Sequence, residues 1–274
     1  MIHKYKRFAK STKEKTKSTK EKAIDLCIGI LCTIVVAGCL SVGIYFYSLS
    51  RDAREFYSLI ETADGRNTAL MDLSGDVPLA GAKSKGFIDL TALQQENSDI
   101  VGWIKIQDTR IDYPVMYTPK DGEYYLHRNF VRKYSLSGVP FIDAACSVTP
   151  RSDNVIVYGH NMKNGSMFSG LLSYQDKTYW RAYEKILFYT SEEVQEYEIL
   201  AAFPIDAADN SQVEKYFIVN LSGKKEFDSY IEEVKKKSLY QTGVDVQYGD
   251  RFLTLSTCSY HTKDGRFLVI AKQS

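Results

Sequence analysis

The C-terminal stretch RFLTLSTCSYHTKDGRFLVIAKQS, residues 251–274, decides the fold that we expect for this chain. Two runs rich in Val, Ile, Leu and Phe flank a loop of turn-forming residues, a pattern that predicts two antiparallel strands. Side chains alternate along a strand, so Cys258 lies on the face opposite Leu253 and Leu255. The leucine face is the expected core, which turns Cys258 toward the more polar side, next to Ser256.

The same hairpin brings Arg266 back beside Cys258 across the strand pair. A cysteine nucleophile reacts as the thiolate, and acyl transfer forms further anions, so a neighbouring cation favours this chemistry. Taken singly, Cys258 is more often a small buried hydrophobic residue, and Arg266 is more often a solvated charge. Their pairing makes a catalytic role the better interpretation of both residues.

Seven further short runs, rich in β-branched and aromatic residues and bounded by turn residues, predict strands. They are GWIKI (102–106), IDYPVM (111–116), VPFID (139–143), DNVIVYGH (153–160), KILFYT (185–190), QEYEILAAFPI (195–205) and KYFIVN (215–220). Apolar residues follow helical spacing at 50–63, at 89–98 and in a longer segment at 226–240. Many short strands with few helices predict a mostly β domain, a barrel or a sandwich.

Residues 26–50, LCIGILCTIVVAGCLSVGIYFYSLS, hold no charged side chain, and about 20 apolar residues are enough for a helix to cross a bilayer. The run is longer than the apolar region of a signal peptide, although the small residues 37–39 leave cleavage as an alternative. Nine of the 35 Lys and Arg residues lie within 1–25, against three acidic residues. Basic flanks stay in the cytoplasm, so we expect a single-pass anchor in the cell membrane, with the C-terminal part outside.

These patterns divide the chain into four expected parts: a basic cytoplasmic tail (1–25), a transmembrane anchor (26–50), an extracytoplasmic helix and linker (51–85) and the β domain (86–274). Beyond the tail, 26 basic and 31 acidic residues give a net charge of −5. A nucleic-acid-binding domain carries a basic patch, so this composition argues against nucleic acid as a partner. Membrane lipid is the expected surrounding of the anchor.

Five cysteines in an exported chain raise the question of a disulfide. Cys27, Cys32 and Cys39 fall within the apolar run, which leaves Cys146 and Cys258 in the β domain. A disulfide between these two would indicate a membrane-tethered, non-catalytic β domain, whereas free thiols favour an enzyme.

Four histidines could assist the cysteine, and topology places His3 on the cytoplasmic side. His160 ends a predicted strand and opens a loop rich in Gly and Asn, a common position for functional side chains. His127 in YYLHRNF and His261, three residues after Cys258, are competing candidates, and we expect His261 to be exposed in the turn. A metal site of His127, His160 and Cys258 is a weak alternative, because neither CxxC nor HxxxH spacing supports it.

An ordered set of motifs runs through residues 86–272: GWIKI, T-R-IDYPV, YYLHRNF, GVPFID, YGHNMKNGSMF and LTLSTCSY, with an arginine eight residues after the cysteine. This set resembles the sortase family of cysteine transpeptidases, and the match is closest to class B. The resemblance implies a closed β-barrel with N-terminal helices, a single transmembrane helix before it, and a long helix, 226–240, before the penultimate strand.

The resemblance also implies roles for three residues: Cys258 as the nucleophile, His160 as the general acid–base, and Arg266 as the group that positions substrate and stabilises the oxyanion. Four residues within the matched motifs are expected to bind substrate: Ser256, Thr257, Asn129 and Asn161. No metal and no other cofactor is expected.

The implied reaction is acyl transfer. The thiolate attacks the Thr carbonyl in the C-terminal sorting motif of a secreted protein, releases an amine and forms a thioacyl-enzyme. An amine of a peptidoglycan precursor then resolves the thioester and anchors the protein in the cell wall; a pilin lysine, used in pilus assembly, is an alternative. A cysteine peptidase, which would transfer the acyl group to water, is a further alternative. After GVPFID the chain reads AACSVTPRSDN (144–154), where class B predicts an aromatic–basic–Asn stretch, so the sorting motif stays open.

Overall fold

The computed structural model describes residues 26–28, 30–45, 47, 88 and 90–274. They fall into two units, before and after residue 51, which are described separately. The first unit holds the helix Leu26–Tyr45, which is long and apolar enough to cross a membrane. Its Thr33 and Ser41 hydroxyls donate to backbone carbonyls of their own helix (2.7 and 2.8 Å), so they suit an apolar environment. The expected tail, the helix at 50–63 and the linker lie outside the described residues.

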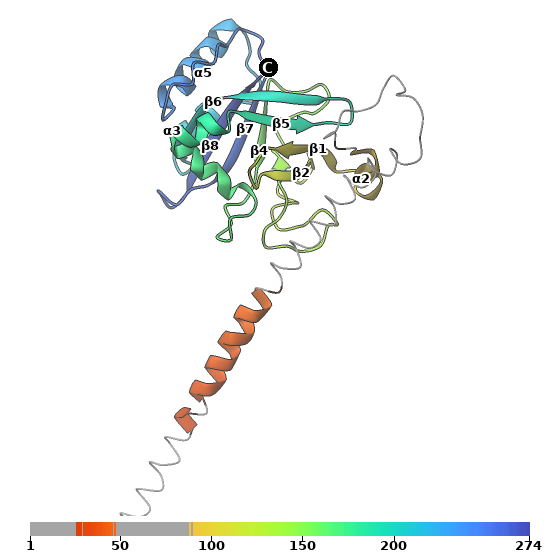
Figure 1. The fold of residues 1–274 in the computed structure, drawn as a ribbon, viewed down its shortest axis with the longest axis vertical. Coiled ribbons are helices and arrows are strands. Elements are labelled where there is room, and N and C mark those ends of the chain that lie inside the picture. The colour runs from red at the N-terminus through yellow and green to blue at the C-terminus, as the bar shows by residue number, and fades with distance from the viewer. Residues whose placement is uncertain (1–25, 29, 46, 48–87, 89) are drawn as a thin grey trace, which may run out of the picture. The chain divides into compact units, whose positions relative to one another are not determined.

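Among residues 90–274, eight strands form a closed barrel in the order β1-β2-β3-β4-β7-β8-β6-β5 (Figure 1). The strands are β1 (Ile100–Lys105), β2 (Asp112–Met116), β3 (Phe141–Ile142), β4 (Asn154–Tyr158), β5 (Lys185–Tyr189), β6 (Val194–Asp206), β7 (Phe252–Cys258) and β8 (Gly265–Gln273). The pairs β2–β3 and β4–β7 are parallel, and the other neighbours are antiparallel. The prediction of a mostly β, closed barrel is confirmed.

Within residues 90–274, one helix precedes the strands and four connect them: α2 (Leu90–Glu96), the 3₁₀ helix η1 (Phe168–Gln175), α3 (Lys177–Ala182), α4 (Asn210–Tyr216) and α5 (Lys224–Lys237). The expected helix at 89–98 corresponds to α2, and the long helix expected at 226–240 corresponds to α5. Helix α5 precedes the penultimate strand, as expected, and its last turn carries lysines where the helix dipole favours cations.

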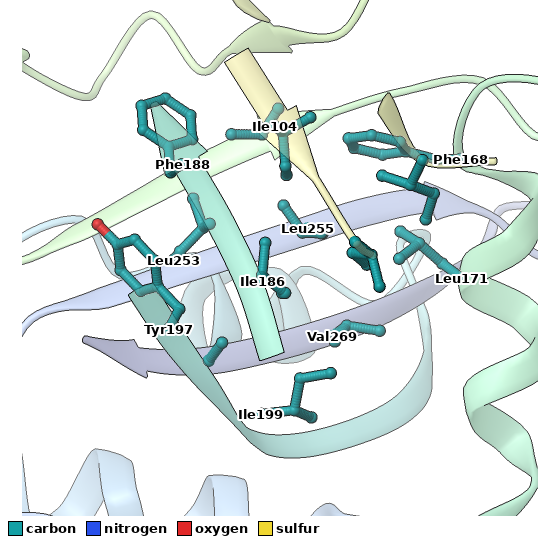
Figure 2. Close-up of a cluster of buried hydrophobic side chains, with 14 of the residues drawn as sticks. Ile104, Phe168, Leu171, Ile186, Phe188, Tyr197, Ile199, Leu253, Leu255 and Val269 are labelled. Atoms are coloured by element: carbon teal, nitrogen blue, oxygen red, sulfur yellow. The ribbon is translucent and has the colours of Figure 1, made fainter. Parts of the chain in front are cut away.

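The barrel interior is apolar and includes the leucine face of β7. Leu253 and Leu255 of β7 and Val269 of β8 belong to one buried cluster with Ile104 of β1 and Ile186 of β5 (Figure 2). Complete burial of such a side chain contributes roughly 1.5–3 kcal/mol. The alternation expected along β7 is therefore confirmed on its inner face.

The outer face of β7 is also buried, so the expectation that this face is the polar side is wrong. Phe252 packs against Phe227 and Tyr230 of α5, with ring centroids 5.8 and 6.1 Å away. The buried Thr254 hydroxyl donates to Asn154 Oδ1 on β4 (2.9 Å). The apolar face of α5 covers this part of the sheet, and only the end of β7, beyond the helix, is open to a cleft.

The segment KYFIVN (215–220) is not a strand, which corrects the sequence prediction. Asp209 caps α4 by accepting from the amide of Ser211 (3.0 Å), and the helix continues to Tyr216. Beyond the helix, the chain pairs through single hydrogen bonds, such as Asn154 N to Val219 O (2.9 Å), instead of a ladder. The apolar residues of this segment pack against the core without forming a sheet edge.

The loop between β2 and β3 is tied to the start of the barrel by a buried polar cluster. Asn97 donates through Nδ2 to Tyr125 Oη (2.7 Å) and to the Phe130 carbonyl (2.5 Å). Tyr125 donates to Asp99 (2.7 Å), and its burial raises the pKa of its phenol to about 12. These bonds hold residues 125–130 in place, including the part of the loop that reaches the site described next.

Candidate active site

A cleft of about 610 Å³ opens where β4 and β7 end and β8 begins, on one side of the barrel. The strand ends contribute Tyr158, Gly159, His160, Ser256, Thr257, Cys258 and Arg266. Strand β3, loops and α4 complete the lining with Gly122, Glu123, Leu126, Phe141, Asp143, Ala144, Ala207, Val213 and Phe217. The cleft thus contains all three residues for which the sequence predicted catalytic roles.

Cys258 and Arg266 are directly paired across β7 and β8, as the hairpin predicted. Because the neighbouring Phe267 side chain points into the barrel, alternation turns Arg266 outward, onto the same side as Cys258. The guanidinium donates from Nη1 to the Gly265 carbonyl (3.2 Å) and, within the described part of the chain, forms no salt bridge. Its remaining N–H groups can therefore receive an anion in the cleft.

The parallel pairing of β4 and β7 brings His160 to the same end of the barrel as Cys258. Tyr158 is opposite Ser256 in the last pair of the ladder, and Gly159 N then donates to Ser256 O (3.1 Å). His160 and Cys258 each lie two residues beyond that pair, and both line the cleft. The three candidate residues therefore come from the adjoining segments that follow β4, end β7 and begin β8.

Two further contacts hold this end of the barrel. The Asn161 side chain donates from Nδ2 to the Cys258 carbonyl (2.9 Å), which joins the two chain segments after their strands end. Gly159 allows the Phe168 ring to pack against the backbone beneath the site, because a Cβ there would lie 2.6 Å from Phe168 Cδ2. The backbone at His160 is therefore held from both sides.

The half-buried imidazole of His160 has a defined hydrogen-bonding pattern. Its Nε2 lies 2.8 Å from the Leu126 carbonyl, and because a carbonyl only accepts, we assign the proton to Nε2. Nδ1 is then the nitrogen available for proton transfer. Burial lowers the pKa of His160, the hydrogen bond to Leu126 opposes this change, and the charges of His127 and Arg266 lower the pKa further.

Cys146 differs from Cys258 in its burial and in its position relative to the cleft. It is buried, its sulfur accepts from the amide of Ile156 (3.4 Å), and burial raises the pKa of its thiol to about 11. Cys146 is absent from the cleft lining, whereas the half-buried Cys258 is part of it. Both thiols are free, so the alternative of a disulfide between them is wrong.

The four residues predicted to bind substrate have different positions. Ser256 lines the cleft with a buried hydroxyl that has no hydrogen-bond partner within the described residues. Thr257 also lines it, but its hydroxyl donates to a backbone carbonyl at the end of β4 (2.7 Å). Asn161 and Asn129 are not lining residues of this cleft, and Asn129 Oδ1 accepts from the amide of Lys133 (2.9 Å) in a turn. Substrate binding by these four residues stays a prediction.

The sequence did not single out several residues of the site. Tyr158 donates to Asp143 Oδ2 (2.7 Å), stacks on Phe217 (5.9 Å between ring centroids) and has a pKa raised by burial. The alternation of β4 places Tyr158 and His160 on one face, a signal that could have identified Tyr158. The Leu126 carbonyl left no signal, because any residue type could supply it.

The competing histidines are both outside the cleft lining. His261 is exposed on the β7–β8 loop, as expected, with Nδ1 3.0 Å from the Ser259 hydroxyl. His127 stacks on His160, with ring centroids 5.4 Å apart. Over the described part of the chain, no three His, Cys, Asp or Glu side chains are grouped closely enough to hold a metal ion.

Comparison with known proteins shows the family of this chain. The family model for the sortase domain matches residues 104–274. A sortase B of Listeria monocytogenes is 31% identical over 248 residues, which cover 89% of this chain and 96% of that protein. The structure of Clostridium perfringens sortase B is 33% identical, with a TM-score of 0.62 over 67% of this chain and 98% of that chain. A Staphylococcus aureus sortase B–substrate complex, 24% identical, shares the fold with a TM-score of 0.68 over 82% and 97% of the two chains. The chain therefore belongs to the sortase family, and the relatives that it matches are class B sortases.

Proposed function

We propose that this protein is a membrane-anchored cysteine transpeptidase that joins secreted proteins to an amine at the cell surface. The observation that carries the proposal is the direct pairing of Cys258 with Arg266 across β7 and β8, next to His160 in one cleft. Cysteine, imidazole and guanidinium together can form a nucleophile, move a proton and stabilise an oxyanion.

In the first half-reaction, the Cys258 thiolate attacks the Thr carbonyl carbon of a sorting motif near the C-terminus of the substrate. A C–S bond forms, and the negative charge moves to the carbonyl oxygen, which Arg266 stabilises. When the C–N bond breaks, the leaving amine takes a proton from His160 Nδ1. The products are a thioacyl-enzyme, a neutral His160 and the released C-terminal peptide.

In the second half-reaction, a primary amine attacks the thioester carbon and gives a proton to Nδ1 of His160. The C–S bond then breaks and restores the thiolate and the imidazolium, so the cycle needs no other reactant. The proposed acceptor is an amine of a peptidoglycan precursor, which anchors the protein in the cell wall. The free Cys258 thiol and the Arg266 guanidinium, which forms no salt bridge with any residue that the structure describes, support a catalytic role over a structural one.

We propose that the helix Leu26–Tyr45 is the membrane anchor and that the basic residues before it stay in the cytoplasm. This topology places the barrel on the outer side, where secreted proteins and a lipid-linked acceptor amine would both meet the enzyme. Membrane lipid would surround the anchor helix.

The test is a two-substrate assay with the full chain in detergent micelles. The enzyme is incubated with a library of sorting peptides and with several amines, and mass spectrometry identifies thioacyl adducts and products. We expect a peptide–amine product that requires Cys258, so that C258A is inactive, whereas C146A keeps its activity. Equal product with and without amine, all of it hydrolysed, would identify a peptidase. Activity retained by C258A would refute the site.

A further inference from the structure

His127 is a titratable residue in contact with the catalytic imidazole that the proposed mechanism does not use. Its ring stacks on His160, with centroids 5.4 Å apart and planes inclined by 22°. The preceding residue, Leu126, supplies the carbonyl that accepts from His160 Nε2 (2.8 Å). Two consecutive residues of one loop therefore contact His160 on different sides, one at the ring edge and one on the ring face.

We propose that His127 is a positioning residue for His160, holding the face of its imidazole while the Leu126 carbonyl holds its edge. The proposal rests on the function proposed above, because it concerns the proton transfers that His160 carries out there. A hydrogen bond at Nε2 alone leaves the ring free to rotate about that bond. Contact on the ring face removes this freedom and keeps Nδ1 directed to the side of Cys258.

The loop that carries both contacts is well anchored, so it can act as a support. The Ser135 amide donates to the His127 carbonyl (3.1 Å), and the Leu126 amide donates to the Glu123 carbonyl (2.9 Å). The His127 ring also has the ring of Tyr134 nearby, with centroids 6.4 Å apart. The backbone at residues 126 and 127 is thus held from both directions along the loop.

The second consequence of this contact is electrostatic. His127 is exposed, and a proton on its ring adds positive charge against the face of His160. Burial lowers the pKa of His160 most, and the charges of His127 and Arg266 lower it further by making the imidazolium less stable. The other titratable groups of the cleft lining are Glu123, Asp143, Tyr158 and Cys258. A neutral aromatic ring at position 127 would keep the support and remove the repulsion.

Two substitutions separate the support from the charge. H127F keeps a flat ring of similar size, and H127A removes the ring entirely. Because His127 is exposed, neither change opens a cavity in the core, and thermal unfolding checks that both variants fold. H261F is the matched control, because it removes another exposed imidazole that lies three residues from Cys258 and does not stack on His160.

Each variant is studied as the full chain in detergent micelles by two measurements. The first is the pH titration of His160, followed by NMR on protein carrying 13C-labelled histidine and assigned with H160Q. The second is kcat and KM for peptide and amine, with the alkylation rate of Cys258 as a measurement that needs no turnover. The NMR titration needs no turnover, so it tests the effect of the His127 charge on His160 even if the proposed reaction is not observed.

We expect H127F to titrate His160 at a higher pH than wild type and to keep at least the wild-type kcat. H127A should lower kcat by about 10-fold or more with little change in KM, since a misplaced proton donor slows chemistry and not binding. H261F should leave the His160 titration unchanged. A wild-type kcat for H127A, or a wild-type His160 titration in H127F, would overturn the proposal.

Discussion

Arg266 offers the most direct test of the proposed chemistry, because it is the only Lys or Arg among the residues that line the described cleft. The same lining holds two carboxylates, Glu123 and Asp143, so substitution of Arg266 by Met changes the local charge from −1 to −2. The reaction forms a thiolate and an oxyanion in this space. The loss of the cation should therefore act on the transition state more than on the folded protein.

The expected magnitude follows from the distance at which a guanidinium can meet an oxyanion. At 4 Å and an effective dielectric constant of 20, two unit charges interact with about 4 kcal/mol. Removal of one oxyanion donor costs roughly 10²–10³ in rate in well-studied hydrolases, which agrees with that figure. R266M should thus lower kcat/KM for peptide by about 10²–10³. R266K should recover little, because an ammonium lacks the planar fork that the paired strands position.

The assay compares kcat/KM of wild type, R266M and R266K, with the pH titration of His160 measured in parallel. Arg266 lowers the pKa of His160 through its charge, so R266M should move the titration to higher pH. More of His160 is then protonated at neutral pH, and a slower reaction cannot be attributed to a lack of imidazolium. A fall in rate of less than 10-fold in R266M, or wild-type rates in R266K, would refute an oxyanion role for Arg266.

Four further predictions concern the thiol, the strand ends, pH and topology. C146A should keep its activity but lose about 1–2 kcal/mol of stability in urea unfolding. The substitution leaves a small cavity, and the amide of Ile156 loses its sulfur acceptor. A stability equal to wild type would contradict this packing. N161A should lower kcat by about 10-fold with KM retained, since the bond to the Cys258 carbonyl is lost; a change in KM alone would instead indicate substrate binding. Burial lowers the folded-state pKa of His160 below the unfolded value of about 6.5, so the unfolded state binds more protons in this pH range. The free energy of unfolding should therefore fall as the pH drops through this range, and it should fall less in H160Q. An identical pH dependence of stability in wild type and H160Q would argue against a buried His160. Protease treatment of intact cells should remove the barrel, whereas protection of the barrel, or its release into the medium, would contradict the proposed anchor.

The parts of the fold that the sequence predicted are those specified by local pattern. The run 251–258, the turn and the run 266–272 contain the alternation and the turn residues of a hairpin, so the pairing of Cys258 with Arg266 followed without knowledge of the rest of the chain. Helix α5 was likewise visible from the spacing of Phe227, Ile231 and Val234. The neighbouring position of His160 required the family resemblance, because parallel pairing of β4 with β7 leaves no local signal.

The parts that the sequence did not predict depend on long-range packing. The outer face of β7 has Thr254 and Ser256, which look polar in sequence, yet α5 covers this face and the Thr254 hydroxyl finds its acceptor on β4. The run 215–220 has strand-like composition, but Asp209 caps a helix that continues to Tyr216 and so includes the first two residues of this run. A backbone acceptor such as the Leu126 carbonyl depends on chain position alone, so no residue pattern could indicate it.

The same alternation that fills the barrel also determines the catalytic geometry. The ladders between β4 and β7 and between β7 and β8 run without a bulge up to the cleft. A shift of β7 and β8 by one residue would turn Cys258 and Arg266 inward, because every side chain would change face. It would also turn Thr254 from the outer face into the apolar barrel interior and break the hydrogen bond from its hydroxyl to Asn154 Oδ1. A buried hydroxyl left without a partner costs roughly 1–3 kcal/mol. The packing on both faces of β7 therefore opposes a shift in register and holds the nucleophile opposite its cation.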